Sequence, residues 1–127
     1  MTITRILTAA ALLLGLAIPS FAAGISPVGT WQTTTGESRY AVNYCGDGTQ
    51  LCATLTWLRE DARTPENLAL LNKTVVNGAV STAANSWKGK VKYEGRTVSG
   101  SVTLMGEDQM LLKGCQLVCK KVGLVRI

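Results

Sequence analysis

The chain has 127 residues, with 13 Lys and Arg side chains against 8 Asp and Glu side chains, and 46% of its residues are hydrophobic. This length predicts one small domain. The sequence contains no histidine, which excludes Ser–His and Cys–His nucleophile pairs, histidine general bases and histidine metal ligands, the commonest parts of catalytic sites.

The N-terminus has the pattern of a secretory signal peptide. Arg5 precedes an apolar stretch at positions 6–18, which is shorter than a typical transmembrane helix. Pro19 follows, and Ser20 and Ala22 are the small residues of a cleavage site. We expect a signal peptide at residues 1–22, a single mature domain at residues 23–127 and no transmembrane segment after cleavage. The alternative is an uncleaved anchor.

From residue 29 onward, short runs of alternating apolar and polar residues are separated by turns that contain glycine, which is typical of antiparallel β-structure. In residues 39–45 and 51–57, the alternation places one set of side chains inside the domain, namely Tyr40, Val42, Tyr44, Leu51, Ala53, Leu55 and Trp57. Residues 59–72 break the pattern. Thr64 can cap a helix that starts at Pro65, with Leu68 and Leu71 on one side. We expect one or two helical turns there, as a lid over a barrel end or as a plain surface crossover.

The C-terminal half continues the alternation. Trp87, Val91 and Tyr93 are expected inside, and Lys88, Lys90 and Lys92 outside. Further runs at residues 97–104, 110–112 and 122–124, together with 29–32 and 74–80, give about eight short strands, the regular spacing of a sandwich or closed barrel.

Four cysteines allow three pairings, and the sequence alone does not choose among them. Cys45 and Cys52 fall on the polar face of consecutive strands and flank one turn, and Cys115 and Cys119 flank another. These positions favour the pairs Cys45–Cys52 and Cys115–Cys119. Disulfides persist in oxidising compartments, which agrees with export. The alternatives, a four-cysteine zinc site or a redox pair, lack a C-x-x-C motif.

Several short motifs resemble the domain of unknown function 2147 family of small exported bacterial proteins, from about residue 29 to residue 127. The motifs are Gly29-Thr30-Trp31, Cys45-Gly46-Asp47, Trp57-Leu58, Leu71-Asn72-Lys73, Trp87-Lys88-Gly89, Glu94-Gly95-Arg96, Leu112-Lys113-Gly114-Cys115, Cys119-Lys120 and Arg126-Ile127. The family has no assigned activity, so the resemblance implies a fold and a periplasmic or secreted location.

A second, looser likeness concerns the two ends of the mature chain. Gly29 and Trp31 open the first strand and Arg126 lies near the end of the last, which resembles lipocalin-type barrels. That resemblance implies a structural role, with Arg126 packed across Trp31 to close one barrel end. The predicted fold is therefore a small, all-β, lipocalin-like antiparallel barrel of about eight short strands with a short helical crossover.

Two functional hypotheses follow. The first is a binding module that takes a small apolar or amphipathic ligand in a pocket lined by Tyr40, Tyr44, Trp57, Trp87 and Tyr93. Small inward residues (Gly89, Gly100, Ala53) would make room for it, or would only accommodate the aromatic rings of a filled core. The second is a solid-core protein that acts as an interaction partner or inhibitor of an envelope component through its loops or through the basic surface of Lys88, Lys90 and Lys92, which Lys113 and Lys121 extend.

Neither hypothesis involves catalysis. The carboxylate pairs Glu60-Asp61 and Glu107-Asp108 are adjacent residues, which tend to point apart, and no nucleophile elbow or phosphate-binding loop is present in the sequence. We expect a protein that is not an enzyme, with no cofactor, no metal and no nucleic-acid partner, because the predicted aromatic face points away from the lysines.

Overall fold

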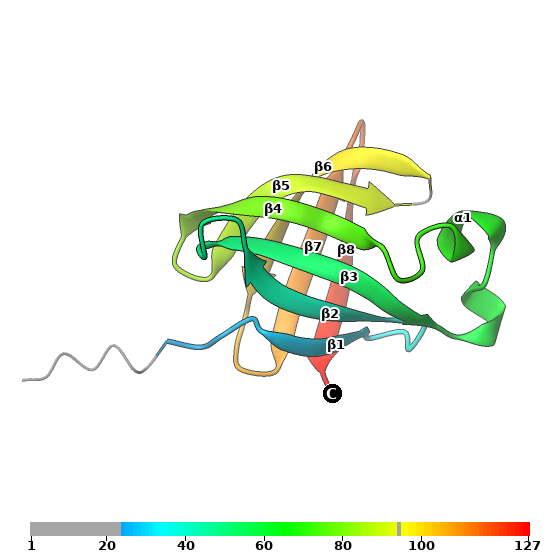
Figure 1. Ribbon diagram of the computed structural model, residues 1–127, viewed down its shortest axis with the longest axis horizontal. Coiled ribbons are helices and arrows are strands. Elements are labelled where there is room, and N and C mark those ends of the chain that lie inside the picture. The colour runs from blue at the N-terminus through cyan, green and yellow to red at the C-terminus, as the bar shows by residue number, and fades with distance from the viewer. Residues whose placement is uncertain (1–23, 94) are drawn as a thin grey trace, which may run out of the picture.

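A computed structural model describes residues 24–93 and 95–127, and it is a closed barrel of eight antiparallel strands joined in chain order (Figure 1). The strands are β1 (Gly29–Thr33), β2 (Ser38–Cys45), β3 (Gln50–Leu58), β4 (Thr74–Ala83), β5 (Ser86–Tyr93), β6 (Arg96–Leu104), β7 (Gln109–Cys115) and β8 (Cys119–Arg126). The predicted fold class is confirmed. The predicted signal peptide and its cleavage position lie outside the described residues.

The crossover between β3 and β4 contains the expected helical turns. A 3-10 turn, Glu60–Ala62, precedes α1, Pro65–Leu68. Thr64 caps α1 by accepting a hydrogen bond from the backbone N–H of Asn67 at 3.2 Å, and Pro65 occupies the first helical position, where its missing N–H costs nothing. Within the described residues, no helix is long and apolar enough to cross a membrane.

The up-and-down topology sorts the connections into two ends. The β2–β3, β4–β5 and β6–β7 turns lie with the chain start at one end, which we call the clasp end. The β1–β2, β5–β6 and β7–β8 turns and the helical crossover lie at the other, which we call the open end. In Figure 1, α1 lies on the opposite side of the barrel from the start of β1.

Both predicted disulfides are present, and each joins the two strands of one hairpin. Cys45–Cys52 ties β2 to β3, with 5.9 Å between the Cα atoms. Cys115–Cys119 ties β7 to β8, where the two residues are direct partners in the ladder. All four cysteines are therefore used in pairs on hairpin ends.

One β-bulge changes the face of a predicted core residue. Tyr40 pairs with Leu55, but Arg39 pairs with Trp57, so β3 has one extra residue, Thr56, between the two pairs. Because side chains alternate along a strand, this insertion moves Trp57 to the outer face, and Leu58 points inward instead. The Arg39 guanidinium lies 4.3 Å from the centre of the Trp57 ring. The prediction of an inward Trp57 is wrong for this reason.

The clasp end has the contacts that the lipocalin likeness implies. The Arg126 guanidinium lies 4.4 Å from the centre of the fully buried Trp31 ring. It also donates to the backbone carbonyls of Val28 at 2.7 Å and Ser26 at 2.6 Å. Gly29 has a φ of 145°, and a Cβ there would lie 2.6 Å from an Arg126 nitrogen. Only glycine therefore leaves room for the guanidinium.

Candidate functional site

The open end contains a hollow of about 310 Å³ beneath the helical crossover. Its base is apolar and includes Leu55, Leu58 and Val75, and its upper wall carries hydroxyl groups from the β1–β2 turn. Ala62, Asn67 and Leu70 of the crossover also line it, so the crossover covers one side of the mouth. The volume is close to the lower limit of ligand pockets, which span roughly 300–1,000 Å³.

Tyr40 places a phenol hydroxyl at this hollow, next to the buried Ser38. Its oxygen accepts a hydrogen bond from the Ser38 hydroxyl at 3.1 Å. Burial raises the pKa of Tyr40 above its ordinary value, and this outweighs the opposite effect of the Ser38 hydrogen bond. The phenol is therefore neutral at physiological pH and keeps a proton that it can donate.

A second hollow, of about 120 Å³, lies among the open-end halves of β5, β6, β7 and β8. Its walls are the apolar side chains of Val91, Val98, Leu112 and Val122, and Gly114 leaves space between them. Tyr93, Leu112 and Val122 line both hollows, so the two are neighbours. This arrangement offers an apolar slot beside a larger and more polar mouth.

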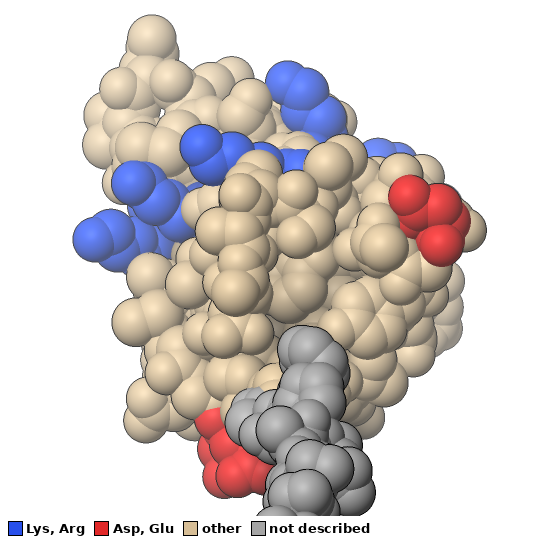
Figure 2. All heavy atoms as spheres, turned by 90° about the vertical axis from the view of Figure 1, so that its left-hand side faces the viewer, with Lys and Arg blue, Asp and Glu red and all other residues tan. Residues whose placement is uncertain are grey.

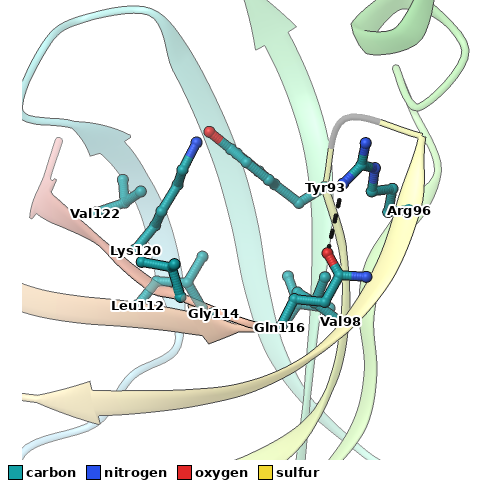
Figure 3. Close-up of a pocket in the computed structure, with 10 residues that line it drawn as sticks. Tyr93, Arg96, Val98, Leu112, Gly114, Gln116, Lys120 and Val122 are labelled. Atoms are coloured by element: carbon teal, nitrogen blue, oxygen red, sulfur yellow. Dashed lines mark hydrogen bonds between the residues drawn. The ribbon is translucent and has the colours of Figure 1, made fainter.

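Two cationic side chains stand at the rim of the smaller hollow (Figure 3). Lys120 extends from β8 toward Tyr93, with its Nζ atom 6.0 Å from the ring centre. Arg96 donates a hydrogen bond to the Gln116 side chain at 3.5 Å. Apolar walls below a positive rim fit a molecule that has an apolar body and an anionic head.

The rest of the barrel interior is filled. A hollow of only about 30 Å³ between β2, β3, β4, β6, β7 and β8 is walled by apolar side chains and Tyr40. Trp31 and Leu51 are buried almost completely nearer the clasp end. The two hypotheses of an open cavity and a solid core thus each describe one half of the barrel.

The structure divides the five side chains that the sequence assigned to the pocket. Tyr40 and Tyr93 line the hollows of the open end. Trp87 is buried toward the clasp end, where its indole N–H donates to the carbonyl of Thr49 at 3.2 Å. Tyr44 is 45% exposed at the clasp end of β2, and Trp57 lies outside the barrel. Among the described residues, only the two tyrosines are thus brought together at the mouth.

Two of the three small inward residues, Gly89 and Gly100, serve packing rather than space for a ligand, whereas Ala53 borders the hollow of about 30 Å³. A Cβ on Gly100 would lie 2.5 Å from a Val91 methyl group, and one on Gly89 would lie 3.0 Å from the Cα of Ala79. Neighbouring atoms already fill both positions. Gly114 differs, because it borders the smaller hollow and a Cβ there would meet only a Val98 methyl group at 3.3 Å.

The lysines of the predicted basic surface lie on the outer face of the strands, and two of them, Lys92 and Lys121, also border the larger hollow. Lys88, Lys90 and Lys92 are exposed on β5, and the ladder aligns Lys88 with Ser101, Ser101 with Lys113 and Lys113 with Lys121 across four strands. Figure 2 looks at the clasp end and shows Lys and Arg side chains in the upper part of the molecule, with one group of acidic side chains near them at the upper right and another at the lower edge.

The sequence reasoning missed the rim residues Arg96, Gln116 and Lys120. The sequence contained part of the information needed to place Lys120. Assigning Lys113 and Lys121 to the outer face of the β7–β8 hairpin implies that Gly114 and Lys120 face the other way. Within residues 24–93 and 95–127, no group of three or more Cys, Asp or Glu side chains is placed to hold a metal ion.

Comparisons with known proteins agree with this fold. A family model described as an uncharacterized protein conserved in bacteria (DUF2147) matches residues 29–126. A similar solved structure is that of protein HP1028 from the human pathogen Helicobacter pylori, which is described as belonging to the lipocalin family. It is 15% identical, with a TM-score of 0.59, and the match covers 81% of this chain and 84% of that one. No curated protein matches this sequence.

Proposed function

The chain belongs to the bacterial DUF2147 family, and from this premise we propose that it binds a small amphipathic molecule in the open end of its barrel, without a catalytic step. One observation carries the proposal. The smaller hollow combines the apolar walls of β5–β8 with the cations Arg96 and Lys120 at its rim. A lipocalin-like fold is compatible with such a role.

The binding mode follows from the chemistry of the walls. The apolar body of the ligand occupies the slot around Gly114, where each Å² of apolar surface removed from water contributes about 25 cal/mol. Its anionic head lies at the rim near Lys120 and Arg96, where a charge-assisted hydrogen bond is stronger than a neutral one. The neutral hydroxyl of Tyr40 offers a further donor in the adjoining larger hollow.

The proposal also locates the protein in the periplasm or outside the cell. The two disulfides support this location, because such bonds are rare in reducing compartments. The denatured mass of protein isolated unreduced from its producing cells tests it. A mass equal to residues 23–127 less four hydrogens is expected. Four intact thiols would contradict the location.

Isothermal titration with decanoate tests the ligand class, and decyltrimethylammonium is the probe of opposite head charge. We expect decanoate to bind more tightly. Gly114→Val fills the slot and weakens decanoate binding at least tenfold, which corresponds to about 1.4 kcal/mol. The matched control is Gly106→Val in the β6–β7 turn of the clasp end, where a Cβ meets nothing within 4 Å.

The head-group contact is tested separately. Lys120→Gln lowers the affinity for decanoate about tenfold and leaves that for the cationic probe unchanged or stronger. Lys88→Gln on the exposed outer face is its control. Equal binding of the two probes, or no effect of Gly114→Val, contradicts the proposed site.

The second hypothesis, a protein that acts through its outer surface, is favoured by the lysine row that crosses β5 to β8. This hypothesis predicts that the native protein carries no discrete small molecule. Reversing the charges of Lys88, Lys90 and Lys92 together should then abolish association with an anionic envelope component, while Gly114→Val leaves that association intact.

A further inference from the structure

The turn between β7 and β8 exposes two adjacent apolar side chains. Leu117 is 100% exposed and Val118 is 73% exposed. The Cys115–Cys119 disulfide closes this turn from strand to strand, and the Gln116 N–H donates to the carbonyl of Val118 at 3.3 Å. A single exposed apolar side chain needs no explanation, but two at the end of a cross-linked hairpin form a small apolar tip.

The tip is surrounded by positive charge. Lys120 and Lys121 follow the tip after Cys119, and Lys113 pairs with Lys121 across the hairpin. The sequence has no Asp or Glu between residues 109 and 127. The turn is the uppermost part of the ribbon in Figure 1. In Figure 2, which keeps the same vertical direction, the top of the molecule is uncharged and Lys and Arg side chains lie below it.

The tip also borders the smaller hollow. Val118, Gln116 and Lys120 line that hollow, so a surface that contacts the tip comes to lie beside its rim (Figure 3). Among residues 24–93 and 95–127, the acidic side chains of the open end lie elsewhere, in the β1–β2 turn (Glu37) and along the crossover (Glu60, Asp61 and Glu66). The hairpin, rather than the whole mouth, is therefore the part that fits an anionic surface.

We propose that the β7–β8 turn docks this protein on an anionic lipid bilayer. The side chains of Leu117 and Val118 enter the interface between head groups and acyl chains, and Lys113, Lys120 and Lys121 contact the phosphates. An anionic polymer would explain the lysines but would leave the two apolar side chains without a role. This docking surface is separate from the proposed ligand site, and vesicle binding is measured without added decanoate.

Vesicle flotation measures the docking, with neutral phosphatidylcholine vesicles compared with vesicles that contain phosphatidylglycerol. We expect at least tenfold stronger binding to the anionic vesicles, weakened by added salt. The double variant Leu117→Ser, Val118→Ser loses this binding at least tenfold. Its control, Met105→Ser, removes an apolar side chain that is 61% exposed at the clasp end and leaves binding unchanged.

The charges are tested by reversing Lys113 and Lys121 together, which keeps a like-charged pair in the ladder. We expect about a tenfold loss of anionic vesicle binding, and a smaller loss when Lys88 and Lys90 are reversed instead. Circular dichroism and the mass of the intact disulfides confirm that each variant is folded.

Three results would overturn the docking proposal: equal binding to neutral vesicles, equal losses in the Met105→Ser control, or binding to dextran sulfate that the Leu117→Ser, Val118→Ser variant retains in full. The last result would identify a polyanion as the partner. The single variant Leu117→Ser separates the two proposals, because Leu117 does not line the smaller hollow. It weakens vesicle docking and leaves decanoate binding as it was.

Discussion

The contact between Arg126 and Trp31 makes a quantitative prediction about what holds the clasp end together. Arg126→Ala removes the guanidinium that lies 4.4 Å from the Trp31 ring centre and that donates to three backbone carbonyls, those of Ser26, Val28 and Glu107. A cation–π contact with a buried ring contributes about 1 kcal/mol or more. Each hydrogen bond adds about 0.5–1 kcal/mol, since water reaches the freed carbonyls. We expect the variant to lose about 2.5–4 kcal/mol of unfolding free energy.

A matched variant separates the ring contact from the carbonyl contacts. Arg39 lies 4.3 Å from the Trp57 ring centre on the outer face, and its side chain makes one hydrogen bond, to Gln32 at 2.9 Å. Arg39→Ala is expected to cost about 1 kcal/mol, because that ring is only partly buried.

Urea unfolding followed by circular dichroism gives both free energies. Thermal unfolding should show the same order, with about 4–8 °C of Tm per kcal/mol in a domain of this size. Equal destabilisation by the two variants would refute the reasoning, because it would mean that the carbonyl contacts of Arg126 add nothing to the stacked pair.

Three further outcomes are expected. Replacing both cysteines by serine should cost about 2.5 kcal/mol at the β2–β3 disulfide and about 2 kcal/mol at the shorter β7–β8 loop, measured by the urea midpoint under non-reducing conditions. Leu124→Ala, at a side chain that is 5% exposed, should cost about 2–5 kcal/mol, while Met105→Ala at the clasp-end surface should change the stability by less than about 0.5 kcal/mol in the same assay. Burial raises the pKa of Tyr40 above its value in the unfolded chain, so its contribution to stability is complete below about pH 10 and is lost as the pH rises further. Tyr40→Phe should therefore reduce the loss of stability at alkaline pH. An unchanged dependence of stability on pH in the variant would contradict this prediction.

The fold was predictable because most strands obey a strict alternation. Trp87, Val91 and Tyr93 face inward and the lysines between them face outward, as the period of two requires. The disulfide pairs followed from the same alternation, because each pair flanks one hairpin turn on one face. Local rules thus sufficed wherever the ladder is regular.

The candidate site was harder to predict because it depends on a β-bulge and on how far along the barrel axis each side chain lies. A bulge that no local signal announces moves Trp57 to the outer face. Tyr44 and Trp87 keep the expected alternation, but they lie at the clasp end. Alternation predicts which face of the strand a residue is on, and it does not predict the position of that residue along the barrel axis. Lys120 was overlooked since a lysine in a strand is ordinarily assigned to solvent.

The distribution of side-chain size explains why one half of the barrel is filled and the other is hollow. Trp31, Trp87 and Leu51 occupy the clasp half. Several inward positions of β5 to β8 near the open end hold small residues, as at Val91, Val98 and Gly114, and these residues line the smaller hollow. The ladders from β5 through β8 run without a register shift, whereas β4 is irregular on both sides. The smaller hollow is therefore built on the most regular strands, so its shape exists before a ligand arrives and binding does not have to create it.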